Sequence, residues 1–374
     1  MRLLFFTSLE RWHGRRWLAA LQENHEVHVV TFRPPKKMIK GVQVHSILPT
    51  EKVVVQKSPQ FAESGNDGFL TFRIGLKFSR AFAEIIDKVQ PDLVHAHQTV
   101  PSGWYAVCAK RKAKNKAPLV VSAWGTDVSH YPSVSWWYRL MNKIVLRRAT
   151  VITATGSHLR DQVLKLRPGA EVLLTPFGVD TSKFYPAAQT SGPNFVFGIA
   201  KALKPVYGID VAIRSLAILI KSQPSARLEI AGDGPEKSKL MALVKDLGIA
   251  HAVSWLGDVD IESIAAVMRG WNAYLLPSKR EAFGVAALEA QATGLPIVAH
   301  RVGGIPEVVK EGSASIMLDS LEPKAFAKAM ADIMSDLDLV QRARREGPIF
   351  VSNNYEWRTT VRAMERLYTG ALNK

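Results

Sequence analysis

The sequence predicts an α/β protein with two Rossmann-like domains, each a doubly wound parallel sheet covered by helices on both faces. Apolar runs of strand length alternate with amphipathic helical segments along the chain. The alternation stops at Pro186–Asn194, PAAQTSGPN, which has the composition of a linker, and then starts again. At 374 residues, the chain is long enough for two domains that each bury a core.

We therefore expect an N-terminal domain over residues 1–186 and a C-terminal domain over residues 187–352. A last amphipathic helix, within residues 353–374, is expected to pack back on the N-terminal domain. The chain begins with two strand-like runs, Arg2–Thr7 and His25–Phe32, separated by a helical segment. A dinucleotide fingerprint needs GxGxxG in this first turn, and Gly14 is the glycine present there, so a classical NAD domain is excluded.

The next strands of the first domain end in polar residues. PDLVHAHQ ends in His95 and His97, and PLVVSAWGTD leads to Trp124 and Asp127. Ligands of open α/β sheets gather at carboxyl strand ends, so these side chains are candidates for a site. Two histidines and an aspartate are too few to predict a metal centre, and we expect none.

Charge is concentrated in the first half of the chain. Up to Tyr185 there are 27 Lys and Arg against 13 Asp and Glu, and the remainder has 22 against 20, so nearly all of the net charge of +16 lies in the first half. This asymmetry indicates a polyanionic partner, for which anionic lipid and nucleic acid both qualify. Two basic segments, Thr71–Val89 and Val134–Ala149, predict helices that either contact a membrane or simply pack on the fold.

Composition favours a cytoplasmic location. The sequence contains one cysteine, Cys108, which excludes an internal disulfide and suits a reducing compartment. No run of 18 or more apolar residues occurs, so no membrane span is predicted.

The second half repeats the alternation of strands and helices and contains Pro277–Gly304, PSKREAFGVAALEAQATGLPIVAHRVGG. Glu281 lies in the loop after a predicted strand, Gly284 begins a helix, and Glu289 is on its second turn. The first amides of a helix suit a phosphate, whereas carboxylates accept hydrogen bonds from sugar hydroxyls. Two carboxylates beside an anion site therefore suggest a nucleotide sugar, although a surface helix with two solvated glutamates has the same pattern.

Taken in order, the motifs resemble those of the family 4 retaining glycosyltransferases, which have the GT-B fold. The resemblance covers nearly the whole chain and is strongest from Phe195 onward. The motifs that carry it are E-x7-E at Glu281–Glu289 followed by LPIVAHRVGGIPEVV, GDGP at Gly232–Pro235, TPFGVDTSKF at Thr175–Phe184, and PDLVHAH followed by WGTD.

The resemblance implies roles for these residues. Glu281, His97 and Lys201 would be catalytic, with Glu281 on the hydroxyls of the transferred sugar and His97 near the leaving group. The residues implied in donor binding are Lys201, Lys204, Gly232, Phe283, Gly284, Val285 and Glu289. Those implied on the acceptor side are His13, Gly14 and Asp127.

The chain departs from the family pattern at two places. The basic pair expected on the diphosphate is represented by Lys201 and Lys204, and Tyr207 stands where a lysine is common. The glycine pair usual near the N-terminus is replaced by His13-Gly14, which bears on the acceptor. In this family the leaving diphosphate is stabilised by cations and helix amides without a metal, and attack on the front face retains configuration.

We expect a metal-independent hexosyltransferase without a cofactor that uses a UDP- or GDP-type sugar and a lipid-linked or cell-envelope glycan as acceptor. It would lie on the inner face of the membrane as a peripheral protein, held by anionic lipid. Two alternatives remain open: a non-catalytic protein that binds a polyanion or nucleic acid, although no nucleic-acid-reading motif is present, and a nucleotide-sugar epimerase.

Overall fold

The computed structural model describes most of the chain, namely residues 1–10, 12–32, 34–35, 37–47, 66–187, 193–260, 262–310 and 314–373. These residues form two compact units. Unit 1 comprises Met1–Pro176 and Thr360–Lys374, and unit 2 comprises Phe177–Thr359.

The division between the units comes earlier than residue 186, where the linker composition placed it. The reason is that the segment after Pro176 packs on unit 2, where the ring of Phe177 lies 6.2 Å from that of Phe283. Residues 188–192 of the predicted linker lie outside the described residues.

In the part of the chain that the structure describes, unit 1 contains a sheet of seven parallel strands in the order β3-β2-β1-β4-β5-β6-β7. The strands are β1 (Arg2–Phe6), β2 (Glu26–Thr31), β3 (Val42–Ser46), β4 (Leu93–His97), β5 (Leu119–Ala123), β6 (Val151–Ala154) and β7 (Val172–Leu174). In the register, Leu3 of β1 pairs with Val27 of β2 on one side and Leu93 of β4 on the other. The strand order reverses between β1 and β4, so their carboxyl ends form the topological switch point of unit 1.

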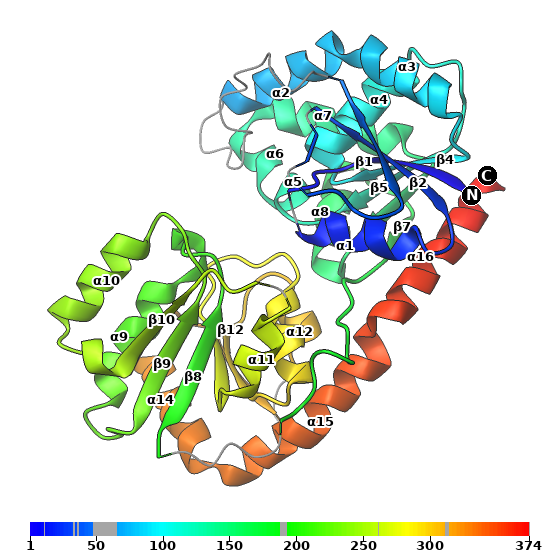
Figure 1. Ribbon diagram of the computed structural model, residues 1–374. Helices are drawn as coiled ribbons and strands as arrows, with labels where there is room; N and C mark the ends of the chain where they lie inside the picture. Colours follow the sequence, from blue (N-terminus) through cyan, green and yellow to red (C-terminus); the bar gives the residue numbers. More distant parts are fainter. Residues whose placement is uncertain are drawn as a thin grey trace. The chain divides into compact units, whose positions relative to one another are not determined.

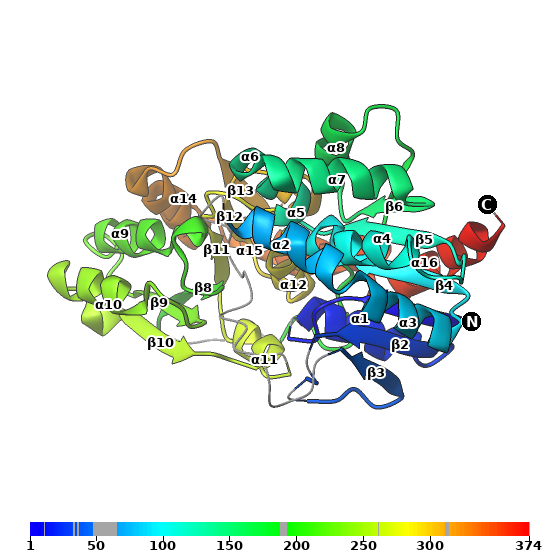
Figure 2. The same ribbon diagram turned by 90° about the horizontal axis from the view of Figure 1, so that it is seen from above.

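Helices cover both faces of this sheet. They are α1 (Trp12–Leu21), α2 (Asn66–Lys77), α3 (Ser79–Val89), α4 (Trp104–Lys110), α5 (Thr126–Ser129), α6 (Tyr131–Val134), α7 (Trp136–Arg148), α8 (Ser157–Leu166) and the part of α16 (Trp357–Leu372) from Thr360. α3, α4 and α7 share one apolar core with β1 and β4, and Figure 2 views these helices from above. α1 and α16 lie on the opposite face (Figure 1).

Unit 2 contains, within its described residues, a sheet of six parallel strands in the order β10-β9-β8-β11-β12-β13. The strands are β8 (Phe195–Ala200), β9 (Ala226–Ala231), β10 (Val253–Gly257), β11 (Ala273–Leu276), β12 (Ile297–His300) and β13 (Ser315–Leu318). Here the strand order reverses between β8 and β11, which makes their carboxyl ends the switch point of unit 2. The two sheets therefore have the doubly wound, all-parallel form that the sequence predicts.

The helices of unit 2 are α9 (Ile209–Leu219), α10 (Lys237–Asp246), α11 (Ile264–Arg269), α12 (Val285–Ala292), α13 (Ile305–Val308), α14 (Pro323–Ser335) and α15 (Leu337–Tyr355). α9, α10 and α14 contribute to one apolar core with β8, β9 and β11. α12 lies on the opposite face of the sheet (Figure 1) and packs on α15.

The end of the chain is divided between the units. α15 ends at Tyr355 and α16 begins at Trp357. At this break Glu356 forms a backbone bridge with Val179. Farther along α16, the hydroxyl of Tyr368 lies 2.7 Å from Nδ1 of His95, so the last helix packs on the sheet of unit 1. Across the described ranges, every helix is too short or too polar to span a lipid bilayer.

Candidate active site

A buried ion pair occupies the switch point of unit 2. Lys201 follows β8 and Glu281 lies in the loop after β11, and Nζ of Lys201 is 2.7 Å from Oε2 of Glu281. Each side chain is only 13% exposed. Ligands of open α/β sheets bind at switch points, so the pair marks the candidate site of unit 2.

Lys201 keeps its positive charge in this environment. Burial by itself would lower the pKa of the ammonium group, but its interactions with the charge of Glu281 and with Tyr274 and Tyr207 outweigh burial and raise the pKa above its ordinary value. The ring of Tyr207 lies 5.0 Å from Nζ of Lys201, which is within cation–π range. Lys201 is therefore a fixed cation at physiological pH.

The Glu281 loop is held in place by close backbone contacts. A Cβ atom on Gly303, whose φ is +57°, would lie 1.8 Å from the carbonyl oxygen of Glu281, and one on Gly304 would lie 2.5 Å from that of Ala282. The amide of Gly304 donates to the carbonyl of Glu281 at 3.1 Å. The double-glycine turn after β12 thus allows the close approach that fixes the catalytic candidate.

The GDGP segment positions the other partner of the ion pair. A Cβ atom on Gly232 would lie 2.0 Å from the carbonyl oxygen of Lys201, and one on Gly234 would lie 2.6 Å from that of Leu203. The amide of Leu203 donates to the carbonyl of Asp233 at 3.0 Å. The structure therefore gives Gly232 a role in packing against the Lys201 segment, and its contact with a donor stays a prediction.

The start of α12 lies directly after Glu281. Gly284 precedes the helix with a φ of +105°, a conformation that favours glycine. The first amides of a helix have no acceptor within it, so those around Gly284 and Val285 can bind an anion. The side chain of Phe283 is buried, and its ring lies 6.0 Å from that of Tyr355, so only its backbone is suited to a ligand.

Glu289 lies on the second turn of α12, and its side chain is buried. It shares a neighbour with Glu281, because the charges of both glutamates act on the hydroxyl of Tyr274. Burial is the main reason that the pKa of Tyr274 rises to about 12. The charge of Lys201 also acts on Tyr274, so Lys201, Glu281 and Glu289 share this buried tyrosine as an electrostatic neighbour.

Lys204 precedes the short helical turn Pro205–Tyr207, and its side chain is half-buried. Its amide donates to the carbonyl of Ala202 at 2.9 Å. From the same segment, the aromatic ring of Tyr207 lies 5.0 Å from Nζ of Lys201. The role of Lys204 on the diphosphate stays a prediction.

His97 occupies the switch point of unit 1, at the end of β4. Its Nδ1 lies 3.1 Å from the hydroxyl of Thr7, which follows β1, and its ring stacks on Trp124 with centroids 4.2 Å apart. Burial, with a contribution from His95, holds its pKa well below the ordinary value, so the imidazole is neutral. Among the described residues, Nε2 is buried without a hydrogen-bond partner. That nitrogen is therefore an unsatisfied polar atom at this switch point, and its contact with a donor stays a prediction.

His95 lies on the same face of β4 as His97, two residues before it, and belongs to a buried chain of hydrogen bonds. Nδ1 lies 2.7 Å from the hydroxyl of Tyr368, and Nε2 lies 2.8 Å from that of Ser122, which in turn lies 2.7 Å from that of Thr153. Burial lowers the pKa of His95 to about 3. Its ring meets that of His97 edge to face at 4.6 Å, so it orients the neighbouring histidine.

Asp127 is fully buried and holds the loop after β5. Oδ1 accepts from the amides of Trp124 at 3.2 Å and Gly125 at 2.7 Å, and Oδ2 accepts from the amide of Thr99 at 2.8 Å and its hydroxyl at 3.1 Å. Burial raises the pKa of Asp127, while these hydrogen bonds act in the opposite direction. The carboxylate positions the Trp124 turn, and its contact with an acceptor stays a prediction.

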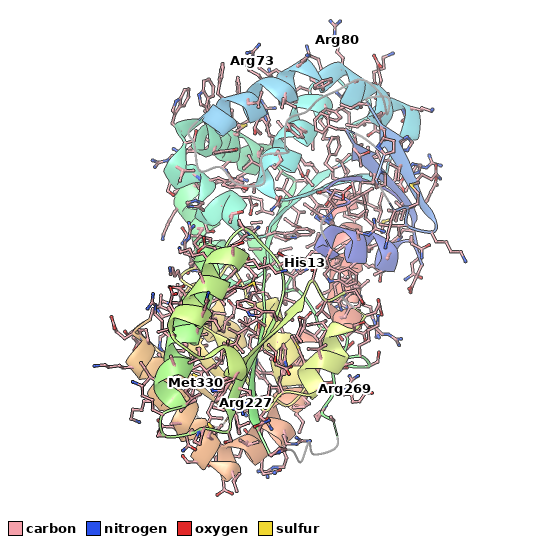
Figure 3. The ribbon with its side chains drawn as sticks, turned by 60° about the vertical axis from the view of Figure 1, so that its left-hand side comes forward. His13, Arg73, Arg80, Arg227, Arg269 and Met330 are labelled. Carbon is pink, nitrogen blue, oxygen red and sulfur yellow. The ribbon has the colours of Figure 1, made fainter. Side chains whose placement is uncertain are left out.

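Gly14 and His13 lie at the start of α1, and His13 is labelled in Figure 3. A Cβ atom on Gly14 would lie 2.7 Å from the carbonyl oxygen of Ser8 and 2.9 Å from the hydroxyl oxygen of Thr7. Gly14 therefore lets α1 approach the residue that contacts His97. His13 is half-buried on the same turn, and its role toward the acceptor stays a prediction.

The sequence did not reveal Thr7, Tyr274 or Tyr368, which contact candidate residues from distant parts of the chain. Thr7 could have been found as the polar residue that directly follows β1, whereas nothing in the sequence pairs Tyr368 with His95. In the ranges that the structure describes, no group of three or more His, Cys, Asp and Glu side chains is arranged to hold a metal ion.

Solved structures share this fold over nearly the whole chain. A sucrose-phosphate synthase from Thermosynechococcus elongatus matches with a TM-score of 0.82 at 18% identity, covering 98% of each chain. The Anabaena protein HepE, solved in complex with UDP-glucose, matches with a TM-score of 0.73 at 18% identity, covering 98% of this chain and 99% of that chain. Two all-parallel α/β units with these neighbours define a protein of the GT-B fold.

Sequence comparison then gives the family. The family model described as glycosyl transferases group 1 matches residues 183–349, and the one described as glycosyl transferase 4-like matches residues 2–156. The N-acetyl-alpha-D-glucosaminyl L-malate synthase of Bacillus anthracis is 23% identical in an alignment of 363 residues that covers 94% of this chain and 91% of that protein. The chain belongs to the family 4-type glycosyltransferases of the GT-B fold.

Proposed function

We propose that this glycosyltransferase is a metal-independent hexosyltransferase that moves a sugar from a UDP- or GDP-type donor to its acceptor with retention of configuration. The observation that carries the proposal is the buried Lys201–Glu281 pair at the start of α12, at the switch point of unit 2. The UDP-glucose in the complex of the Anabaena neighbour is in keeping with a nucleotide-sugar donor.

In this proposal Lys201 and the first amides of α12 bind the diphosphate. An ammonium group has three donor hydrogens, and Glu281 takes one of those on Lys201, which leaves others for phosphate oxygens. As the glycosidic bond breaks, negative charge grows on the leaving diphosphate. A preorganised cation and helix amides stabilise that charge in the transition state without moving. Lys204 would supply further positive charge.

The two glutamates would bind the hydroxyl groups on either side of the diphosphate. Glu281 lies just before the helix and would accept hydrogen bonds from the transferred sugar, whereas Glu289 lies one turn deeper and would bind the ribose. The ion pair with Lys201 holds the carboxylate of Glu281 in position. Gly232, through its packing on the Lys201 segment, keeps this geometry in place.

His97 would contact the donor sugar as a neutral group. Its lowered pKa excludes an imidazolium at physiological pH, so it serves as a hydrogen-bonding group. When the Thr7 hydroxyl donates to Nδ1, the proton is on Nε2, which then donates to a sugar oxygen.

For the chemical step we propose front-face attack. The acceptor oxygen bonds to the anomeric carbon while the bond from that carbon to the phosphate oxygen breaks, and the departing phosphate takes the acceptor's proton. No protein nucleophile is needed. Glu281 and Glu289 lie on one loop and one helix, not on opposite sides of a bond as a hydrolase requires.

The acceptor would be a lipid-linked or cell-envelope glycan, used by a peripheral protein on the inner face of the cell membrane. The support is the excess of positive charge in the first half of the chain, 27 Lys and Arg against 13 Asp and Glu up to Tyr185. Each cation placed near an anionic leaflet contributes about 1 kcal/mol to binding.

Replacing Glu281 tests the proposed function. The change Glu281→Ala removes the sugar-binding carboxylate and should reduce transfer from UDP- or GDP-sugars at least about a hundredfold. The matched control is Glu262→Ala, which removes an exposed glutamate from the same unit and should leave transfer unchanged. Near-normal transfer by Glu281→Ala would contradict the assignment. Turnover of the donor by the wild-type protein without an acceptor would instead indicate an epimerase.

A further inference from the structure

The helix α2 has an unusual distribution of side chains between its two faces. A surface helix normally buries its large apolar residues and exposes polar ones. In α2 the buried positions are taken by small residues, Gly68, Thr71 and Gly75, whereas Leu70 and Leu76 are 51% and 48% exposed. Phe72 and Ile74 of α2 pack against the core of unit 1, whereas Leu70 and Leu76 face away from it.

Close packing explains the small residues. A Cβ atom on Gly68 would lie 2.6 Å from the hydroxyl oxygen of Ser135, and one on Gly75 would lie 2.3 Å from Nε1 of Trp104. The inner face of α2 is thus fully occupied by its neighbours. Leu70 and Leu76 take no part in this contact, so it does not account for their presence on the surface.

The adjacent helix α7 extends the exposed apolar surface. Trp136, at its first position, is 63% exposed and stacks on Trp137 with centroids 3.9 Å apart. Trp137 in turn lies 5.0 Å from the ring of Phe69 on α2. An aromatic cluster therefore joins the two helices, with Leu140 exposed one turn farther along α7.

Positive charges surround these apolar side chains. The α2–α7 face is defined here by eight exposed side chains of the two helices, Phe69, Leu70, Arg73, Leu76, Lys77, Trp136, Arg139 and Leu140. The sequence of α7 contains four basic residues and no acidic one, WWYRLMNKIVLRR. Arg73, and Arg80 on α3, point outward from the unit (Figure 3), and the first acidic residue beyond them is Glu84.

We propose that the α2–α7 face docks on an anionic phospholipid bilayer. Tryptophan favours the boundary between headgroups and hydrocarbon, and exposed leucines gain free energy by entering it. Lysine and arginine extend from such a surface to the headgroup phosphates. A nucleic acid would match the charge, but it offers no apolar phase for the aliphatic side chains of Leu70, Leu76 and Leu140. The inference rests on the proposed function, since it gives the transferase a place beside a lipid-linked acceptor.

Vesicle co-sedimentation of the full chain tests the proposal, with phosphatidylcholine vesicles that contain or lack phosphatidylglycerol. The wild-type protein should bind only when the anionic lipid is present. Leu70→Ser/Leu76→Ser and, separately, Trp136→Ser should each weaken binding about tenfold. Arg73→Gln/Lys77→Gln should weaken it about fivefold for each cation removed, and added salt should reproduce that loss.

Matched controls come from unit 2. Leu337→Ser/Ile349→Ser removes two exposed apolar side chains, and Lys324→Gln/Arg345→Gln removes two exposed cations, and both should bind vesicles as the wild type does. UDP affinity and thermal unfolding of every variant should match the wild type, which shows that each is folded. Binding that ignores anionic lipid, equal losses in the controls, or DNA binding in place of vesicle binding would overturn the proposal. If vesicle binding fails while sugar transfer remains, only the docking inference fails, whereas loss of wild-type transfer and UDP binding would contradict the proposed function.

Discussion

The two units have the same kind of sheet but contrasting chemistry at their switch points. In unit 2, Lys201 after β8 and Glu281 after β11 form an ion pair. In unit 1, the corresponding places at the ends of β1 and β4 are taken by Thr7 and His97, which form a neutral contact. The same topology thus presents charge in one unit and an uncharged, buried hydrogen-bonding group in the other.

This difference indicates a division of work. A diphosphate needs fixed positive charge, which the raised pKa of Lys201 secures. The sugar contact proposed for His97 uses a neutral hydrogen-bonding group, which the lowered pKa of His97 secures. The surroundings of Lys201 raise its pKa and keep it charged, whereas burial lowers the pKa of His97 and keeps it neutral.

The largest effect is expected for a change at His97, which should slow the chemical step without weakening donor binding. His97→Ala should lower kcat about a hundredfold, because it removes the group that we propose contacts the sugar near the leaving group. Its affinity for UDP should remain that of the wild type, since the diphosphate is assigned to unit 2. Steady-state kinetics together with calorimetric UDP titration measures both quantities. Equal losses in kcat and UDP affinity would break the proposed division.

The next effect concerns stability and pH. Because the pKa of His95 is about 3 in the folded protein and 6.5 ordinarily, the unfolded state binds more protons between these values. The unfolding free energy of unit 1 should therefore fall as pH drops below 6.5, by about 1.4 kcal/mol per pH unit for each such histidine. His97 acts in the same direction.

Lys201 should act with the opposite sign in unit 2. Its folded pKa is raised above 10.5, so the stability it contributes is fully present below pH 10.5 and is lost as pH rises through the folded value. Urea unfolding from acid to alkaline pH, followed by tryptophan fluorescence, measures both limbs. In a His95→Gln variant the unfolding free energy should fall less steeply below pH 6.5, by the contribution of one proton. An unchanged slope would contradict the assignment.

A smaller effect is expected at Tyr207, whose ring faces the ammonium group of Lys201. Tyr207→Leu should weaken UDP binding about three- to tenfold, the size of a partly shielded cation–π contact. Tyr207→Phe keeps the ring and should bind UDP normally. In a Lys201→Ala background the Tyr207→Leu change should have no further effect, and a full effect there would show that Tyr207 does not act through Lys201.

Much of the fold follows from the sequence because the cues are local. The alternation of strands and helices predicts two parallel sheets, and the spacing of Glu281, Gly284 and Glu289 predicts a loop, a helix start and a second turn, as the structure has them. The division at Pro176 was not predictable from composition. The position of the division depends on the packing of Phe177 against Phe283 of unit 2, which is a tertiary contact.

The site was less predictable, because its key contacts join distant residues. Lys201 and Glu281 are 80 positions apart, and His95 and Tyr368 are 273 apart, so no sequence period links them. Asp127 lies at the expected edge of the sheet, yet its carboxylate turns inward to the amides of its own loop and of Thr99. Position at a strand end can be read from sequence, whereas side-chain direction cannot.

Calorimetric titration of UDP into the wild-type protein, Lys201→Ala and His97→Ala tests the central claim most directly, namely that the charged switch point holds the diphosphate and the neutral one does not. Loss of a charge-assisted contact should weaken UDP binding by Lys201→Ala about 10- to 100-fold. His97→Ala should bind UDP as the wild type does. Unchanged affinity in Lys201→Ala, or a comparable loss in His97→Ala, would contradict the account.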